Sequence, residues 1–238
     1  MTKVWNSIWD NYKNLSTERI MDEPAGSTQR VEFVELLMKH IDLKGKSVLE
    51  VGTGTGQYSI ELGKHGANCT GIDIEQGSID LAKRIASDME VENCNFQKYN
   101  LFECKKSNNY DIVFSMGTVE HFNQHEIIAM FKKMAEIGKY VIVGVPYSGS
   151  HAYMFAKEMS IAKETWEYGV ENDFWSLHEH FRKSGIEPIH EETIGLVSEA
   201  MYLKRVNHAL IPVQIAINER KKKEGKPFGS WLISIGES

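Results

Sequence analysis

The chain has 238 residues, of which 42% are hydrophobic and 25% are charged, and its formal net charge is −6. This size and composition fit one large domain with a sizeable core, while the acidic balance argues against DNA or bulk RNA as a partner. Three cysteines without a C-x-x-C pair argue against a disulfide framework or structural zinc. With no run of about 18 apolar residues and no signal-peptide pattern, we expect a cytoplasmic protein without a membrane span.

The first part of the chain alternates helical and strand-like segments. Residues 31–41 place Val31, Val34, Leu37, Met38 and Ile41 on one helical face, and Ser78 has the character of an N-cap. The predicted helices are 31–41, 57–65, one that begins after Ser78, and one that carries Ile127, Ile128, Phe131 and Met134. The predicted strands are 47–51, 69–73, 94–98, 111–115 and 140–145.

The pattern changes after Pro146. Residues 147–172 are rich in aromatic side chains without a strand pattern, which predicts an insertion over the sheet. Beyond it we expect a helix at 173–184, a strand at 186–191, a helical segment at 196–219, a charged turn at 220–226 and a last strand at 229–235. The basic run 221–223 is interpreted as a solvated connection.

Strands that alternate with helices predict an α/β fold with a mainly parallel sheet and helices on both faces. We interpret residues 1–238 as a single domain. Residues 1–30 are expected to form an N-terminal helical lid, and residues 147–172 and 196–219 to form cap insertions.

A glycine-rich loop, Gly52-Thr53-Gly54-Thr55-Gly56, separates a predicted strand from a predicted helix. Ligands of open α/β sheets bind at the carboxyl ends of strands, and glycines allow a close approach of the backbone. A dinucleotide fingerprint requires glycine where this chain has Gln57. Glu50, two places before the first glycine, repels a pyrophosphate but can pair with an ammonium group. The loop therefore favours a nucleoside ligand with an amino-acid end.

The segment 50–56 resembles the first motif of the class I S-adenosylmethionine-dependent methyltransferases, and three further segments match in order. Residues 71–74 resemble the end of the second strand, residues 99–102 the adenine-binding segment, and residues 110–115 with 119–121 the fourth-strand motif. The resemblance covers residues 30–145 and is only architectural beyond them. The chain departs from the pattern at Asn100, where aspartate is usual, and at Val119, where leucine is usual.

This resemblance implies a Rossmann-like, doubly wound fold with a seven-stranded, mainly parallel sheet. It implies S-adenosylmethionine as cofactor, with Asp73 on the ribose hydroxyls. An N-terminal tyrosine closes over the methionine part in many similar enzymes, so Tyr12 is a candidate for that role or for helix packing. The cofactor-binding residues expected from the resemblance are Tyr12, Glu50, Gly52, Thr53, Gly54, Gln57, Asp73, Ile74, Asn100, Leu101, Ser115 and Met116.

Two residues beyond the fourth strand are candidates for catalysis. His121 is a candidate base, and the alternative is a structural hydrogen bond to a neighbouring loop. Glu120 either orients a substrate amine or caps the next helix. His121 and His125 have the spacing of metal ligands, but the sequence offers no third ligand, so no metal is expected.

The acceptor pocket is expected from the two insertions, with Tyr153, Phe155, Trp166, Tyr168 and Met201 as candidate lining; a cap core or a dimer contact is the alternative. His151 is a candidate residue at the mouth of this pocket.

We interpret the chain as an enzyme that methylates an oxygen or nitrogen of a small metabolite by in-line displacement. The alternatives are an RNA or protein methyltransferase and a catalytically silent donor-binding module. We expect no nucleic-acid or membrane partner, and a monomer or homodimer.

Overall fold

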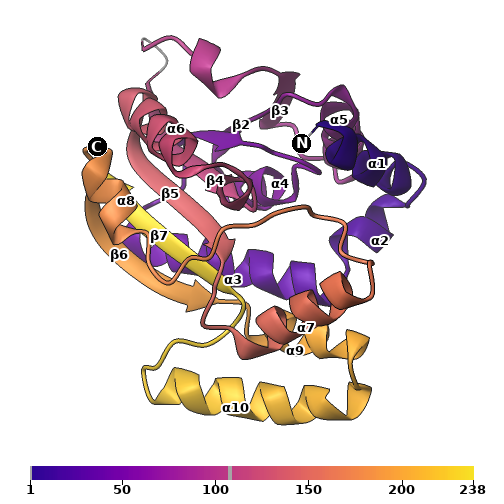
Figure 1. Cartoon of the computed structure of the whole chain (residues 1–238). Helices are drawn as coiled ribbons and strands as arrows, with labels where there is room; N and C mark the ends of the chain where they lie inside the picture. Colours follow the sequence, from indigo (N-terminus) through magenta and orange to yellow (C-terminus); the bar gives the residue numbers. More distant parts are fainter. Residues whose placement is uncertain (1, 107–108) are drawn as a thin grey trace.

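A seven-stranded sheet forms the centre of the computed structural model, which describes residues 2–106 and 109–238 (Figure 1). The strand order is β3-β2-β1-β4-β5-β7-β6, and the first five strands are parallel while β7 runs antiparallel to both its neighbours. The strands are β1 (Ser47–Val51), β2 (Asn68–Asp73), β3 (Cys94–Lys98), β4 (Tyr110–Met116), β5 (Gly138–Pro146), β6 (Glu187–Ile194) and β7 (Trp231–Glu237). The predicted Rossmann-like, seven-stranded, mainly parallel sheet is confirmed.

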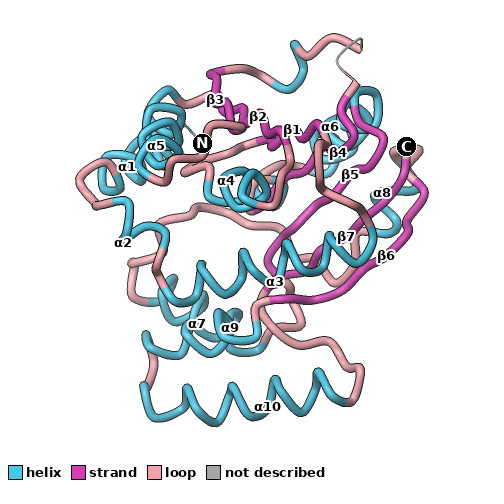
Figure 2. Tube along the Cα trace, turned by 180° about the vertical axis from the view of Figure 1, so that it is seen from behind, coloured by secondary structure: helices cyan, strands magenta, loops and turns pink. Residues whose placement is uncertain are grey.

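Helices cover both faces of this sheet, as the alternating pattern predicted (Figure 2). One face buries its apolar side chains against α6 and α8, and the opposite face packs against α3 and α4. The helices are α1 (Thr2–Tyr12), α2 (Thr17–Met21), α3 (Pro24–His40), α4 (Gln57–Lys64), α5 (Gln76–Asp88), α6 (Gln124–Ile137), α7 (His151–Ala162), α8 (His178–Lys183), α9 (Leu196–Tyr202) and α10 (Ile211–Lys223).

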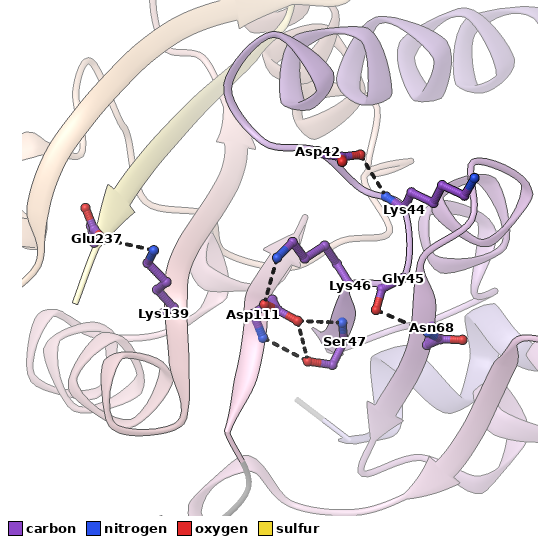
Figure 3. Close-up of polar contacts among 9 residues, drawn as sticks. All are labelled: Asp42, Lys44, Gly45, Lys46, Ser47, Asn68, Asp111, Lys139 and Glu237. Carbon is purple, nitrogen blue, oxygen red and sulfur yellow. Dashed lines mark hydrogen bonds and ion pairs between the residues drawn. The ribbon is translucent and has the colours of Figure 1, made fainter.

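Polar contacts fix the strands at their amino-terminal edge (Figure 3). The Asp111 carboxylate at the start of β4 accepts hydrogen bonds from the backbone nitrogen and hydroxyl of Ser47, at 2.9 and 2.8 Å, and from Lys46 Nζ at 3.1 Å. These bonds lower the pKa of Asp111. Because they hold β1 and β4 in register, the loops that follow both strands meet at the opposite edge, where ligands of such sheets bind.

Three details of the helices differ from the sequence predictions. Val31 and Met38 of the predicted face are 48% and 53% exposed. Val34, Leu37 and Ile41 are buried as predicted, together with Phe33 and Leu36. Ser78 lies inside the first turn of α5, whose N-cap is Glu75, and its hydroxyl donates to the Glu75 carbonyl oxygen.

The carboxyl-terminal segment also differs from the predictions. The predicted helical stretch 196–219 is divided into α9, two short 3₁₀ turns (Leu203–Arg205 and His208–Leu210) and α10. The break coincides with Asn207, whose side chain accepts a hydrogen bond from the Ala209 nitrogen and caps the second turn. Helix α10 then continues through the predicted charged turn as far as Lys223 and lies beyond α7 and α9, far from the sheet (Figures 1 and 2).

Gly56, the N-cap of α4, is a glycine whose substitution we expect to lower stability strongly. Its φ is +72°, and a Cβ there would lie 2.7 Å from the Phe96 ring and 2.9 Å from the Ala82 Cβ. Left-handed backbone and overpacking together predict that Gly56→Ala lowers the free energy of unfolding by roughly 3 kcal/mol. Gly45→Ala, with a φ of +71° and open space, is the control and is expected to cost about 1 kcal/mol. Equal losses in urea denaturation would contradict this assignment.

Candidate active site

The glycine loop lies between β1 and α4 and is held against the end of β2. The backbone nitrogens of Gly52 and Thr53 both donate to the Ile72 carbonyl oxygen, at 2.9 and 3.0 Å. Gly52 and Gly54 have positive φ angles, and a Cβ on Gly52 would collide with the Thr118 side chain. The glycines therefore allow both the turn itself and the close approach of the loop that follows β4.

Two carboxylates hold this loop in shape. Glu50 is buried and accepts hydrogen bonds from Thr53 Oγ1 at 2.7 Å and from Ser59 Oγ at 2.5 Å. Asp73, at the end of β2, accepts from the backbone nitrogens of Gly54 at 3.1 Å and Glu75 at 2.9 Å. Both carboxyl groups also line the cavity described below, so they are placed to meet a ligand that lies over the loop.

Burial of Glu50 predicts a pH-dependent stability. Desolvation raises the pKa of Glu50 to about 7, although the bonds from Ser59 and Thr53 oppose the shift. Because the folded pKa lies above that of the unfolded chain, the native state binds more protons between about pH 4.5 and 7, and its stability falls as pH rises through this window. Once the pH has passed this window, we expect the ionised Glu50 to have lowered the free energy of unfolding of the ligand-free protein by about 3 kcal/mol.

The measurement is urea denaturation at pH 5 and pH 8 for the wild type and for Glu50→Gln. Glutamine keeps an acceptor oxygen for Ser59 and Thr53 but does not titrate, so the fall with pH is expected to be smaller by about 3 kcal/mol in the variant. The same fall in both proteins would show that Glu50 is not the group responsible.

A cavity of 560 Å³ opens over the carboxyl ends of β1, β2 and β4. It brings together eleven of the twelve residues that we expected to bind the cofactor. These are Tyr12, Glu50, Gly52, Thr53, Gly54, Gln57, Asp73, Ile74, Asn100, Leu101 and Met116.

Ser115 is the exception and a correction. It is fully buried, its hydroxyl donates to the Val51 carbonyl oxygen at 2.9 Å, and it does not line the cavity. Met116, the last residue of β4, lines the cavity, whereas Ser115 lies one residue farther from the strand end.

Helix α1 covers this cavity with aromatic rings. The rings of Trp5 and Trp9 stack with centroids 6.0 Å apart, and Trp9 meets Tyr12 edge to face at 6.2 Å. A Cβ on Gly54 would lie 3.0 Å from Trp9, so the indole lies directly over the glycine loop. Both interpretations of Tyr12 are therefore compatible with its position, since it packs within α1 and also lines the cavity.

Glu120 and His121 follow β4 in a short 3₁₀ helix (Val119–His121) and also line the cavity. Glu120 does not cap the next helix, because Asn123 is the N-cap of α6. The imidazole of His121 makes the structural contact that was one alternative, with Nδ1 3.1 Å from the Val170 carbonyl oxygen. A hydrogen bond there requires a proton on Nδ1 and leaves Nε2 as an acceptor, 3.8 Å from Glu120 Oε1.

The environment of these two residues favours their neutral forms. Burial raises the pKa of Glu120 to about 8, and the neighbouring carboxylate of Glu171 acts in the same direction. Burial lowers the pKa of His121. Glu120 Oε2 and Trp9 Nε1 are the cavity-lining polar atoms that are buried without a hydrogen-bond partner among the described residues, and Glu120 Oε2 is the acceptor of the two that a ligand can satisfy.

The segment after β5 supplies the remaining wall. Tyr153, Trp166 and Tyr168 line the cavity as expected, whereas Phe155 and Met201 do not. His151 is exposed at the start of α7, outside the cavity.

Three residues of this wall were not predicted: Glu171, Tyr202 and Trp231. Glu171 lies in a stretch without strand or helix, and Tyr202 and Trp231 lie in a predicted helix and a predicted strand in which no motif marks them as site residues. The carboxyl groups of Glu120 and Glu171 and the His121 ring have ligand atoms within 4.8 Å of one another, a spacing that a metal ion can bridge.

Comparison with known proteins agrees with this geometry. Residues 48–139 match the family model described as a methyltransferase domain. A ubiquinone biosynthesis O-methyltransferase of Coxiella burnetii is 39% identical over 93 residues, which are 39% of this chain and 38% of that protein. Phosphoethanolamine N-methyltransferase 1 of Triticum aestivum is 31% identical over 130 residues, 52% of this chain and 26% of that protein. The chain spans less than half of the length of these curated relatives.

Solved structures of low sequence identity share the fold. Magnesium protoporphyrin IX methyltransferase from Synechocystis PCC 6803, solved with bound S-adenosylhomocysteine, aligns with a TM-score of 0.64 and 16% identity over 90% of this chain and 83% of that one. The [4+2]-cyclase SpnF aligns with a TM-score of 0.60 and 16% identity over 87% and 80% of the two chains.

The sheet order, the antiparallel β7 and the glycine loop after β1 define a Rossmann-like methyltransferase fold. Residues 48–139 match the methyltransferase-domain model, and the chain shares its fold with solved methyltransferases. In the part of the chain that the structure describes, no helix has the length and apolar character that a membrane span requires.

Proposed function

We propose that this protein is an enzyme that binds S-adenosylmethionine in the cavity over the glycine loop and transfers its methyl group to an oxygen or nitrogen of a small molecule. One observation carries the proposal: a single cavity holds the Asp73 carboxylate, the glycine loop and the unpartnered Glu120 carboxyl group. Its volume of 560 Å³ is typical of pockets for ligands of this size.

The lining residues fit this cofactor. Asp73 would accept hydrogen bonds from the ribose hydroxyls, and Glu50 would pair with the ammonium group of the amino-acid end, directly or through water. The adenine ring would lie against Asn100, Leu101 and Ile74. The rings of α1 would cover the sulfonium, a contact that an aromatic face favours.

The same residues disfavour a dinucleotide. Gln57 occupies the position of the third glycine, and its side chain is fixed at both ends: Oε1 accepts from Arg30 Nη1 at 2.7 Å, and Nε2 donates to the Ile20 carbonyl oxygen at 3.1 Å. A pyrophosphate would also lie close to Glu50 without a cation to neutralise it.

The cofactor supplies a methyl group already activated on a sulfonium, so the chain needs to orient the acceptor, exclude water and accept a proton. Glu120 and His121 are placed to accept this proton.

A small acceptor is favoured because α1 and the segment after α7 line the cavity from both sides. The names of the relatives, which include O- and N-methyltransferases, fit this class of acceptor. We also propose a cytoplasmic location, since the three cysteines are unpaired thiols.

The experiment is incubation with donor labelled on its methyl group and a cell extract that has been separated by size. Label in the small-molecule fraction is the expected result. Label in protein or RNA would favour a macromolecular acceptor, and the absence of transfer with intact donor binding would favour a silent module and contradict the proposed activity.

A further inference from the structure

The acceptor end of the cavity is a cluster of ionisable groups around Glu120. Glu171 Oε2 accepts a hydrogen bond from Tyr153 Oη at 2.6 Å and forms an ion pair with Lys157 Nζ at 2.9 Å. Glu171 and Lys157 have side chains only 6% and 9% exposed, so their charges neutralise each other inside the protein. Glu120 Oε2 has no such partner among the described residues, and the contact of Glu120 with His121 is a long one, 3.8 Å from Oε1 to Nε2.

The charge of the cavity lining is strongly one-sided. Five carboxyl groups line it, and among the described lining side chains there is no lysine or arginine. Lys157 lies behind this lining and is already engaged by Glu171. An acceptor that carries a phosphate or carboxylate would therefore be buried next to acidic groups without a basic partner, which is strongly unfavourable.

Aromatic rings complete the surroundings of Glu120. Trp5 meets the His121 ring at 5.1 Å, Tyr153 meets Trp166 at 6.4 Å, and Lys157 Nζ lies 5.7 Å from the centre of the Trp166 ring. Aromatic faces attract ammonium groups, and Lys157 shows that this wall already accommodates one.

We propose that the acceptor is an amine, which enters as its ammonium ion and binds Glu120 between these rings. This inference rests on the proposed function. The ammonium gives one proton to Glu120 Oε2, and the freed lone pair of nitrogen forms a bond to the methyl carbon of the donor. The carbon–sulfur bond breaks and its electron pair stays on sulfur, so the products are the N-methylated ammonium and S-adenosylhomocysteine. The proton on Glu120 leaves to solvent.

A divalent metal is the competing occupant of the same cluster. Its ligands would be Glu120, His121 and Glu171, but Glu171 Oε2 is already bonded to Lys157 and Tyr153. The ammonium of Lys157 also repels the double charge of a metal ion more strongly than the single charge of an amine. An amine needs only the one free carboxylate oxygen that the structure offers, so the observations favour the amine.

The test is calorimetric titration of the complex with S-adenosylhomocysteine, using benzylamine, benzyl alcohol and benzoate as probes of equal ring size, and zinc chloride in a separate run. We expect benzylamine to bind at least about tenfold more tightly than benzyl alcohol, and benzoate not to bind. Glu120→Gln is expected to remove this preference. Glu158→Gln, an exposed carboxylate of α7, is the control and is expected to retain it.

Three results would contradict the proposal that the acceptor is an amine. They are binding of the alcohol or benzoate as tight as that of benzylamine, no binding of any probe, or stoichiometric zinc binding that Glu120→Gln abolishes. The wild-type comparison does not depend on the folding of any variant. If S-adenosylhomocysteine itself does not bind, the proposed function fails first, which distinguishes that outcome from a wrong acceptor class.

Discussion

Replacement of Glu120 by glutamine is expected to lower turnover by about 10²–10⁴-fold while leaving the affinity for S-adenosylhomocysteine within about twofold. Glutamine keeps the size of the side chain and an acceptor oxygen but cannot take a proton. The measurement is steady-state turnover with the acceptor found by methyl labelling, beside calorimetric binding of the product. Glu158→Gln on the exposed face of α7 removes a carboxylate away from the cavity and is expected to behave as the wild type.

The pH dependence separates a proton acceptor from a residue that only fills space. Burial and Glu171 raise the pKa of Glu120 to about 8, while Lys157 opposes the shift. A base must be unprotonated in the free enzyme, so kcat/KM of the wild type is expected to rise with pH up to about 8. This rise is expected to be absent in Glu120→Gln. Wild-type turnover in the variant would show that Glu120 does not accept the proton.

Replacement of Asp73 by alanine is expected to weaken donor binding by about 10- to 100-fold, because the ribose hydroxyls lose a charged acceptor. The carboxylate also accepts the backbone nitrogens of Gly54 and Glu75, so part of the loss would come from a less ordered glycine loop. Calorimetric titration with S-adenosylhomocysteine measures the effect.

Asp80→Ala is the matched control for this prediction. Asp80 is an exposed carboxylate of α5 whose side chain accepts a hydrogen bond from the Gln76 side chain. It does not line the cavity. Its removal is expected to leave donor affinity unchanged. Unchanged affinity in Asp73→Ala as well would exclude Asp73 from the donor site.

The strands and the donor end of the cavity were predictable because their signals are local. β1 and β3 have the predicted bounds, since each is a short segment between a turn and a polar loop. The glycine loop, Glu50 and Asp73 lie within one β-α-β unit, so the topology of that unit brings them together at the sheet edge. The exposed faces of α3 at Val31 and Met38 were not predictable in this way, because neighbouring elements decide which apolar residues a helix buries.

The acceptor end depends on contacts between distant segments. Glu171 reaches Tyr153 and Lys157 across a stretch without strand or helix, and Asn172 fixes that stretch by donating to the Glu120 and Phe122 carbonyl oxygens at 2.9 and 2.6 Å. No periodicity encodes these contacts. The sequence therefore indicated Glu120 and His121 as candidates, but not that Glu171 would be paired with Lys157 and Tyr153 while Glu120 Oε2 has no hydrogen-bond partner among the described residues.

The most direct test of the donor site is calorimetric titration of the wild-type protein with S-adenosylhomocysteine, beside a nicotinamide dinucleotide. The arrangement of Glu50, Asp73 and Gln57 around the glycine loop predicts saturable, roughly micromolar binding of the first ligand and none of the second. No binding of S-adenosylhomocysteine, or a preference for the dinucleotide, would contradict the proposed donor and the methyl transfer that depends on it.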